Sequence, residues 1–170
     1  MKALRITLYL ITGIVLLFFS LGVIVPSYVY QSSIVVNASP EKCWAAYHDT
    51  KEMAERLEGF ESLTLKSGEL LSPGSMYEIV VNDKGRRMVM SEKIMEIIAP
   101  NKISYELNND VSRSEFSFSF EGIASTTITS KCKISGNSIL WKSILFLSKS
   151  FTVNAVPQQF EGLKKVIEKQ

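Results

Sequence analysis

The N-terminal part of the chain is one long apolar run. From Ile6 to Val25 there are 20 residues without a charge. At about 1.5 Å per residue, a helix of this length spans roughly 30 Å, which is the thickness of a bilayer core. The pattern therefore predicts a transmembrane helix over residues 6–26, with Pro26 ending the helix.

Two other structures are compatible with an apolar N-terminus. A cleaved signal peptide is the first, because Ser20, Leu21 and Gly22 form a small-x-small site. The apolar core of a signal peptide, however, usually has only about 7 to 15 residues, and here apolar residues continue past that site. A buried core helix is the second, but this run is apolar on all sides. We therefore favour an uncleaved anchor.

Charge around the run predicts its orientation. Lys2 and Arg5 precede it, and the positive-inside rule places that end in the cytoplasm, with the rest of the chain on the outer, periplasmic or extracytoplasmic, side. Tyr28 and Tyr30 suit the membrane interface, and residues 27–32 form a tether of at most about 20 Å. The sequence thus divides into an anchor with a juxtamembrane segment (1–30) and a domain (31–170).

The domain begins with a strand that runs directly into a helix. Residues 34–36 are β-branched and favour a strand, whereas Ser39 can cap a helix whose first turn is set by Pro40. Cys43 and Tyr47 then fall on one face of this helix, together with Trp44. That face needs a sheet to cover it.

Alternating and helical patterns divide the remaining chain. A second short helix starts at Asp49 or Thr50 and ends at Gly59, and the last helix starts at Asn137 or Ser138, with Val156 on its apolar stripe and a kink at Pro157. Strands are predicted between them at 60–66, 76–81, 86–98, 102–107, 116–120 and 126–134.

The order of these segments resembles the START-like (SRPBCC) superfamily, which includes polyketide cyclases, lipid-transfer domains and the birch-pollen allergen fold. The resemblance covers about residues 33–168 and starts with the Ala-Ser-Pro-Glu-Lys-Cys-Trp segment at 38–44. It continues through Leu-Glu-Gly-Phe (57–60), Gly-Ser (74–75), Gly-Arg-Arg (85–87), Glu-Ile-Ile-Ala-Pro (96–100) and Phe-Glu-Gly-Leu-Lys-Lys (160–165).

The resemblance implies an α+β helix-grip fold. In this fold a curved antiparallel sheet, here of about seven strands, surrounds a long C-terminal helix and leaves a cavity between them. The transmembrane helix would be added at the N-terminus.

Charge and composition exclude several functions. The chain has 19 Lys and Arg and 17 Asp and Glu, so without Lys2 and Arg5 it is balanced, which argues against a nucleic-acid partner. Two cysteines and one histidine cannot build a four-ligand zinc site, and no cofactor is expected. Cys43 and Cys132 are predicted core thiols; a disulfide between them stays open.

The sequence contains no nucleophile elbow, phosphate-binding loop or dinucleotide fingerprint. If the domain were an enzyme, acid and base residues would come from Glu78, Glu92, Tyr105 and His48. Each has a structural alternative: a solvated strand carboxylate for Glu78, a strand facing that a bulge could switch for Glu92, a core ring for Tyr105 and a helix-terminal cation for His48. No catalytic residue is therefore assigned.

The interior face is better suited to binding. Rings and flexible thioethers adapt to an apolar guest, and the predicted cavity residues are Met88, Met90, Tyr105, Phe116, Phe118 and Phe120. We expect a membrane-anchored module that binds a hydrophobic small molecule or lipid. The alternatives are a cyclase or dehydrase acting on a hydrophobic polyketide-like or aromatic substrate, a membrane-tethered interaction domain, and a core that fills its own interior.

The segment 139–147 is more apolar than a helix on a sheet requires, since seven of its nine residues are large and apolar. Trp141, Leu145 and Phe146 are predicted to contact the membrane or the anchor helix, with Lys142 and Lys149 reaching the head groups. The segment would then be the entrance for the ligand. Loops or a second copy of the chain are the alternative covers.

Overall fold

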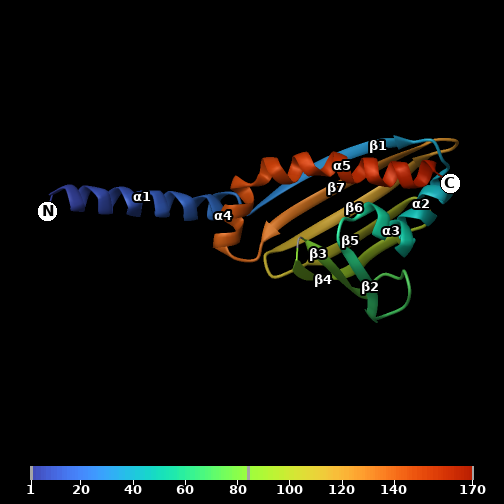
Figure 1. Cartoon of the computed structure of the whole chain (residues 1–170), viewed down its shortest axis with the longest axis horizontal. Helices are drawn as coiled ribbons and strands as arrows, with labels where there is room; N and C mark the ends of the chain where they lie inside the picture. Colours follow the sequence, from blue (N-terminus) through green and yellow to red (C-terminus); the bar gives the residue numbers. More distant parts are fainter. Residues whose placement is uncertain (1, 84, 170) are drawn as a thin grey trace.

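The computed structural model describes residues 2–83 and 85–169, except for the side chains of Arg56, Asp83 and residues 151–152 and 154–159. Its seven strands form one antiparallel sheet in the order β1-β7-β6-β5-β4-β3-β2, so the predicted α+β class is confirmed (Figure 1). The elements are α1 (Lys2–Ile24), β1 (Ser27–Val36), α2 (Pro40–His48), α3 (Thr50–Arg56), β2 (Phe60–Ser67), β3 (Met76–Asp83), β4 (Arg86–Ile98), β5 (Lys102–Asn108), β6 (Ser112–Gly122), β7 (Thr126–Gly136), α4 (Ile139–Leu147) and α5 (Lys149–Glu168).

The two short helices begin where the sequence predicts. The Ser39 hydroxyl accepts a hydrogen bond of 3.4 Å from the Lys42 N–H at the start of α2. The Asp49 carboxylate accepts one of 2.7 Å from the Lys51 N–H at the start of α3. These side chains satisfy backbone donors that have no partner within the helix, which fixes both starting points. Gly59 ends the segment with a φ of 77°.

Strand β1 starts earlier than predicted. It begins at Ser27, only three residues after α1 ends, and pairs with β7 along its whole length. Tyr28 lies opposite Ile134 and is buried, and Tyr30 lies opposite Cys132. The residues expected to form a tether are therefore the first half of a strand, and no flexible spacer separates α1 from the sheet.

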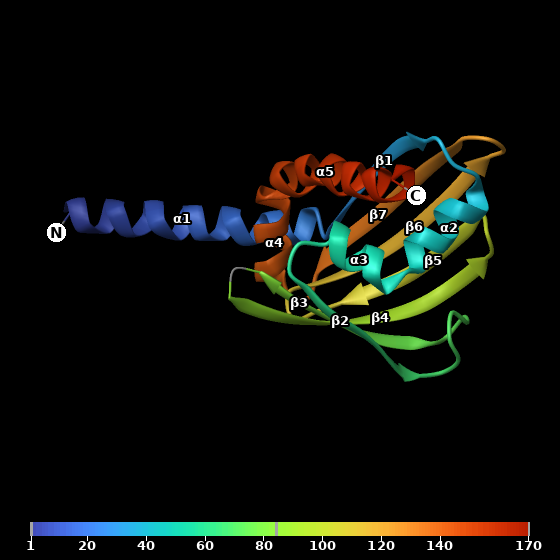
Figure 2. The same cartoon turned by 45° about the vertical axis from the view of Figure 1, so that its right-hand side comes forward.

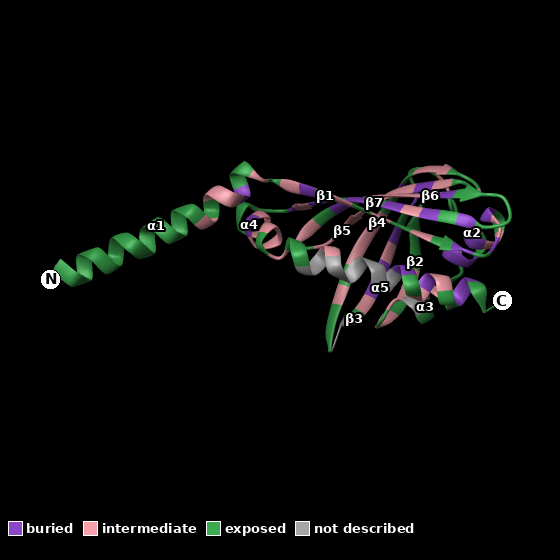
Figure 3. Ribbon diagram, turned by 90° about the horizontal axis from the view of Figure 1, so that it is seen from above, coloured by how far each residue is buried: buried purple, intermediate pink, exposed green. Residues whose placement is uncertain are grey.

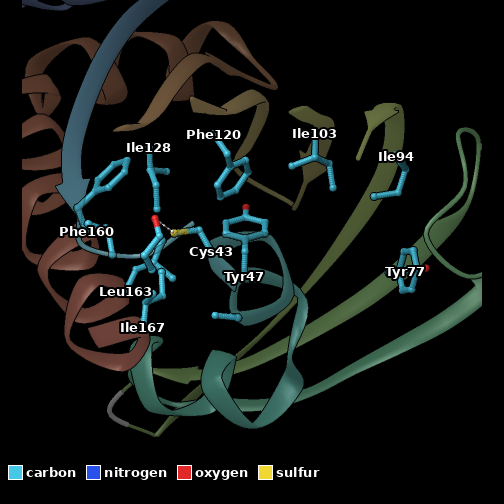
Figure 4. Packing of buried hydrophobic residues seen from close by; sticks show 13 residues of the cluster. Cys43, Tyr47, Tyr77, Ile94, Ile103, Phe120, Ile128, Phe160, Leu163 and Ile167 are labelled. Carbon is cyan, nitrogen blue, oxygen red and sulfur yellow. Dashed lines mark hydrogen bonds between the residues drawn. The ribbon is translucent and has the colours of Figure 1, made fainter. Parts of the chain in front are cut away.

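Helix α5 lies over the sheet and closes the main core. Phe160, Leu163 and Ile167 are buried at helical spacing and belong to the same cluster as Ile128 and Cys43 (Figure 4). Tyr77 and Ile94 belong to this cluster too, but they lie on strands away from α5 (Figure 4). The sheet curves around the helix, as in a helix-grip fold.

The C-terminal helix is divided, and the prediction of one long helix is wrong. α4 starts after Ser138, whose hydroxyl accepts a 3.3 Å hydrogen bond from the Trp141 N–H, and it ends before Ser148. α5 then runs as one helix through position 157. The side chains of Val156 and Pro157, on which a predicted stripe and kink depended, lie outside the described residues.

Helix α1 projects away from the domain (Figures 1 and 2). Nearly all of its residues are exposed, and only its last turns are covered (Figure 3). It has 23 residues, and its most apolar stretch of 18 residues has a mean hydropathy of 2.3, so by length and composition it could cross a membrane.

Candidate ligand-binding cavity

The domain has a cavity of about 810 Å³ that is partly open to solvent. Strands β2 to β6 form most of its wall, and the rest comes from α2, α3, α5, the β2–β3 loop and single residues of β1 and β7. Its apolar side chains include Leu63, Leu65, Leu70, Leu71, Ile79, Val81, Met90, Ile94, Ile103, Leu107, Phe160 and Leu163. The volume falls within the range of about 300 to 1,000 Å³ that is usual for small-molecule sites.

Three rings from β5 and β6 form one wall of the cavity. Phe116 and Phe118 project to the same face of β6, because side chains alternate along a strand. The Tyr105 ring stacks on Phe116 at 5.2 Å and on Phe118 at 6.1 Å between ring centres. This wall is flat, aromatic and apolar.

A pair of phenols adds a polar point to this wall. Tyr47 from α2 and Tyr105 from β5 both line the cavity, and their hydroxyl oxygens are hydrogen-bonded at 3.0 Å. The Tyr47 ring also packs on Phe118, with 4.9 Å between ring centres. Next to Tyr47, the His48 Nδ1 is 2.8 Å from the Trp44 carbonyl oxygen, which sets the orientation of its ring. Few polar groups in a mostly apolar cavity are typical of sites that orient a ligand.

Four of the six predicted cavity residues line the cavity: Met90, Tyr105, Phe116 and Phe118. Phe120 does not, because Trp44 and Tyr47 of α2 cover its ring at 5.7 and 5.6 Å and it is fully buried in the core. Met88 is half-buried nearer the β3–β4 turn and is not part of the lining.

The contribution of α3 and of the β2–β3 loop to the cavity was not predicted from the sequence. The cavity is lined by Thr50 and Met53 of α3 and by Leu57 just after this helix. The β2–β3 loop contributes Leu70 and Leu71. The apolar pairs Met53–Leu57 and Leu70–Leu71 were the available signal. Tyr77 also lines the cavity, and its hydroxyl accepts a 2.8 Å hydrogen bond from the Leu71 N–H, which ties this loop to β3.

The four titratable candidates separate into two groups. Glu92, Tyr105 and His48 line the cavity. Glu78 does not, and its carboxylate forms an ion pair of 2.9 Å with Lys66 on the outer face of the sheet. Among the described residues no cluster of three metal-binding side chains is found.

The two cysteines are free and buried. Burial raises the pKa of the Cys132 thiol to about 11, although the hydrogen bond with Tyr30 acts in the opposite direction. Burial also raises the pKa of Cys43, and burial together with the Cys132 contact raises that of Tyr30. Both cysteines are therefore protonated at neutral pH and act as small core residues, as predicted.

Helix α4 does not have the position expected of a ligand entrance. None of its described residues lines the cavity. Leu145, one of the three residues predicted to contact the membrane, packs inward against the cluster of Tyr28, Cys132 and Ile134. Trp141 and Phe146 are half-buried.

A curved antiparallel sheet around a C-terminal helix, with a cavity between them, defines the helix-grip class of proteins. No protein-family model and no curated protein matches this sequence. Solved structures share the fold. Ara h 8.0201 is 13% identical with a TM-score of 0.63, covering 85% of this chain and 99% of that one.

Two further structures show the same likeness. A START superfamily protein from Mycobacterium smegmatis is 14% identical with a TM-score of 0.64, covering 83% of this chain and 97% of that one. Norcoclaurine synthase from Thalictrum flavum, solved in complex with dopamine and hydroxybenzaldehyde, is 14% identical with a TM-score of 0.60. The match covers 85% of this chain and 88% of that one. The START-like fold predicted from the sequence is thereby confirmed.

Proposed function

We propose that this protein is a membrane-anchored binding module that holds a hydrophobic or lipid-like ligand in its internal cavity. The cavity itself is the observation that supports this proposal. It occupies about 810 Å³ and is walled mainly by aliphatic and aromatic side chains. An apolar guest in this space would remove its own surface and that of the wall from water, which is worth about 25 cal/mol per Å².

The tyrosine pair indicates which kind of ligand fits. The Tyr47 and Tyr105 hydroxyls, hydrogen-bonded to each other, place a polar point on a mostly apolar wall. A ligand with one hydroxyl, carbonyl or carboxyl group could add a hydrogen bond there while its apolar part lies against Phe116 and Phe118. The proposed ligand is therefore amphipathic, with one polar end.

Helix α1 supports the second part of the proposal. Its 23 residues are long and apolar enough to span a bilayer, and its side chains are exposed along most of its length. Exposure of these apolar side chains to water would be unfavourable, whereas their contact with lipid is favourable. We propose that α1 is an uncleaved anchor with its N-terminus in the cytoplasm and the domain on the outer side.

Mass spectrometry of the organic extract of the purified full chain tests ligand binding. We expect a retained apolar or amphipathic species at a defined ratio to protein. Leu107→Trp, which fills the cavity, should lose it, whereas Met95→Trp on an exposed position outside the cavity should keep it. If wild type retains nothing and does not enhance anilinonaphthalene sulfonate fluorescence, the binding function is wrong and an interaction domain is favoured.

A second candidate function rests on the titratable groups of the cavity wall. Glu92, Tyr105 and His48 lie where a substrate would bind. One protein of this fold, norcoclaurine synthase, is an enzyme by name. Turnover of a hydrophobic aromatic or polyketide-like substrate that is lost in Glu92→Gln or Tyr105→Phe, with folding intact, would favour a cyclase or dehydrase.

A further inference from the structure

Helix α4 has two apolar sides, and only one of them faces the domain. Its nine residues include only two polar ones, Lys142 and Ser143. Leu145 packs into the core, but Ile139, Leu140 and Leu147 are 48%, 44% and 58% exposed. This second side needs a cover that the described residues of the domain do not supply.

The position of α1 identifies where the second side points. Gly22 of α1 is buried against α4, so that a Cβ there would meet the Ile139 carbonyl oxygen and lie 2.6 Å from the Ser143 hydroxyl. At about 100° per residue, Ile139, Leu140 and Leu147 lie within about 60° of Ser143 around the helix, whereas Leu145 lies about 160° away. The exposed residues thus flank the contact with α1.

The contact also fixes the depth of α4 relative to α1. Gly22 is two residues before the end of α1, which corresponds to about 3 Å along the helix, and it lies inside the uncharged run that would cross the membrane. α4 runs across α1 in Figures 1 and 2 and is seen nearly end-on in Figure 3. A helix that crosses the end of a transmembrane helix lies parallel to the membrane surface.

We propose that α4 is an interfacial helix, with the side formed by Ile139, Leu140 and Leu147 inserted at the boundary between phospholipid head groups and acyl chains. This inference rests on the proposed membrane insertion of α1. It differs from the predicted role as a ligand entrance, since α4 does not line the cavity. Its consequence is a fixed orientation: α4 and α1 together hold the domain against the bilayer at one angle.

The bilayer is a better cover than a second copy of the chain. The exposed side of α4 is continuous with exposed apolar side chains of α1, including Phe19 and Val23 close to the Gly22 contact. Lipid that surrounds α1 therefore reaches α4 without any additional surface. Lys142 of α4 can extend its ammonium group to the lipid phosphates, whereas the Lys149 Nζ lies over the Tyr28 ring, 5.6 Å from the ring centre.

Depth-dependent fluorescence quenching of the full chain in phosphatidylcholine nanodiscs tests this inference. An environment-sensitive NBD label is attached to Leu140→Cys or Leu147→Cys, and quenched by lipids that carry spin labels at shallow or deep acyl positions. Leu10→Cys, in the middle of α1, reports insertion of the anchor. Ile123→Cys, at a 90% exposed position between β6 and β7, is the aqueous control. The native cysteines are buried and do not compete for the label.

We expect a blue shift and quenching at positions 140 and 147 that is strongest with the shallow spin label, deep quenching at position 10, and none at position 123. Quenching at position 10 alone would overturn the interfacial role of α4 while leaving the anchor intact. No quenching at position 10 would overturn the anchor, and with it this inference. A blue shift at 140 and 147 without lipid quenching would show that protein, a second copy included, covers α4.

Discussion

At the scale of single residues, the helix that packs on the inward side of a strand decides which side chains of that side can contact a ligand. Phe116, Phe118 and Phe120 share the inward side of β6, but α2 covers Phe120 with both Trp44 and Tyr47, whereas only Tyr47 contacts Phe118. Phe120 is therefore core, whereas the other two line the cavity. The alternation in the sequence predicts the shared face but not the position at which the covering helix ends, which depends on contacts between distant segments.

The buried thiol of Cys132 predicts a dependence of stability on pH. Its pKa is raised from an ordinary value of 9.0 to about 11 in the folded state, mainly by burial. A raised pKa means that the unfolded chain releases this proton first, so the free energy of unfolding falls as the pH rises from about 9 to about 11. Below pH 9 this contribution is fully present.

Urea denaturation of the full chain in micelles between pH 7 and pH 11 measures the effect. Above pH 9 we expect the urea midpoint to decrease less steeply with pH in Cys132→Ala than in wild type. Removal of the buried sulfur should also lower the midpoint of Cys132→Ala by a constant amount at every pH. The same slope in both proteins would contradict the assignment. Ile128→Val is the matched control, because it removes volume from the buried core and keeps both buried thiols.

At the scale of elements, local signals predicted well and pairing between distant segments did not. Ser39, Pro40 and Asp49 determine the starts of α2 and α3 within a few residues, and the structure has both helices there. The start of β1 depends instead on β7, about 100 residues later in the chain, which pairs with Tyr28 and Tyr30. From sequence alone these tyrosines were equally compatible with a membrane interface.

The break between α4 and α5 was missed for a similar reason. The segment around Ser148 contains no glycine or proline, so helix propensity gives no stop signal there. The turn is made by tertiary packing: α4 lies between two glycines, Gly22 of α1 and Gly136 of β7, whose missing side chains leave room for its backbone.

The cavity was also only partly predictable. The apolar face of the sheet predicted an interior, but not whether side chains fill that interior.

The close approach of α4 to Gly22 predicts that alanine substitution affects stability very differently at two glycines of α1. Alanine at Gly22 would place its Cβ against the Ile139 oxygen and Ser143, whereas at Gly13 it would meet nothing within 4 Å. Gly13→Ala should stabilise α1 slightly through helix propensity, and Gly22→Ala should instead cost about 1 to 3 kcal/mol by overpacking. Thermal unfolding of both variants in the same micelles measures this, and equal midpoints would show that α1 does not pack on α4.

At the scale of the whole molecule, the direct connection between α1 and β1 would couple the cavity to the bilayer in which we propose that α1 is inserted. Val25 and Pro26 are the only residues between the two elements, and α4 packs on both α1 and β7. The domain is thus attached to α1 by a short connection and by a packed helix. If α1 spans the bilayer as proposed, a ligand would enter or leave the cavity at a constant distance from the lipid surface.

The last prediction concerns the side of the membrane on which the domain lies. Lys2 and Arg5 precede the apolar run of α1, and the positive-inside rule predicts that they stay in the cytoplasm if α1 spans the membrane as proposed. Ile123→Cys in intact cells should therefore react with a membrane-impermeant maleimide added outside, because this position is exposed on the domain. The unchanged chain is the control, since Cys43 and Cys132 are buried and stay unlabelled. Replacing both Lys2 and Arg5 by Glu removes the bias, so part of the chains should insert in the opposite direction and lose labelling. Labelling of Ile123→Cys only after lysis would place the domain in the cytoplasm and contradict the proposed orientation.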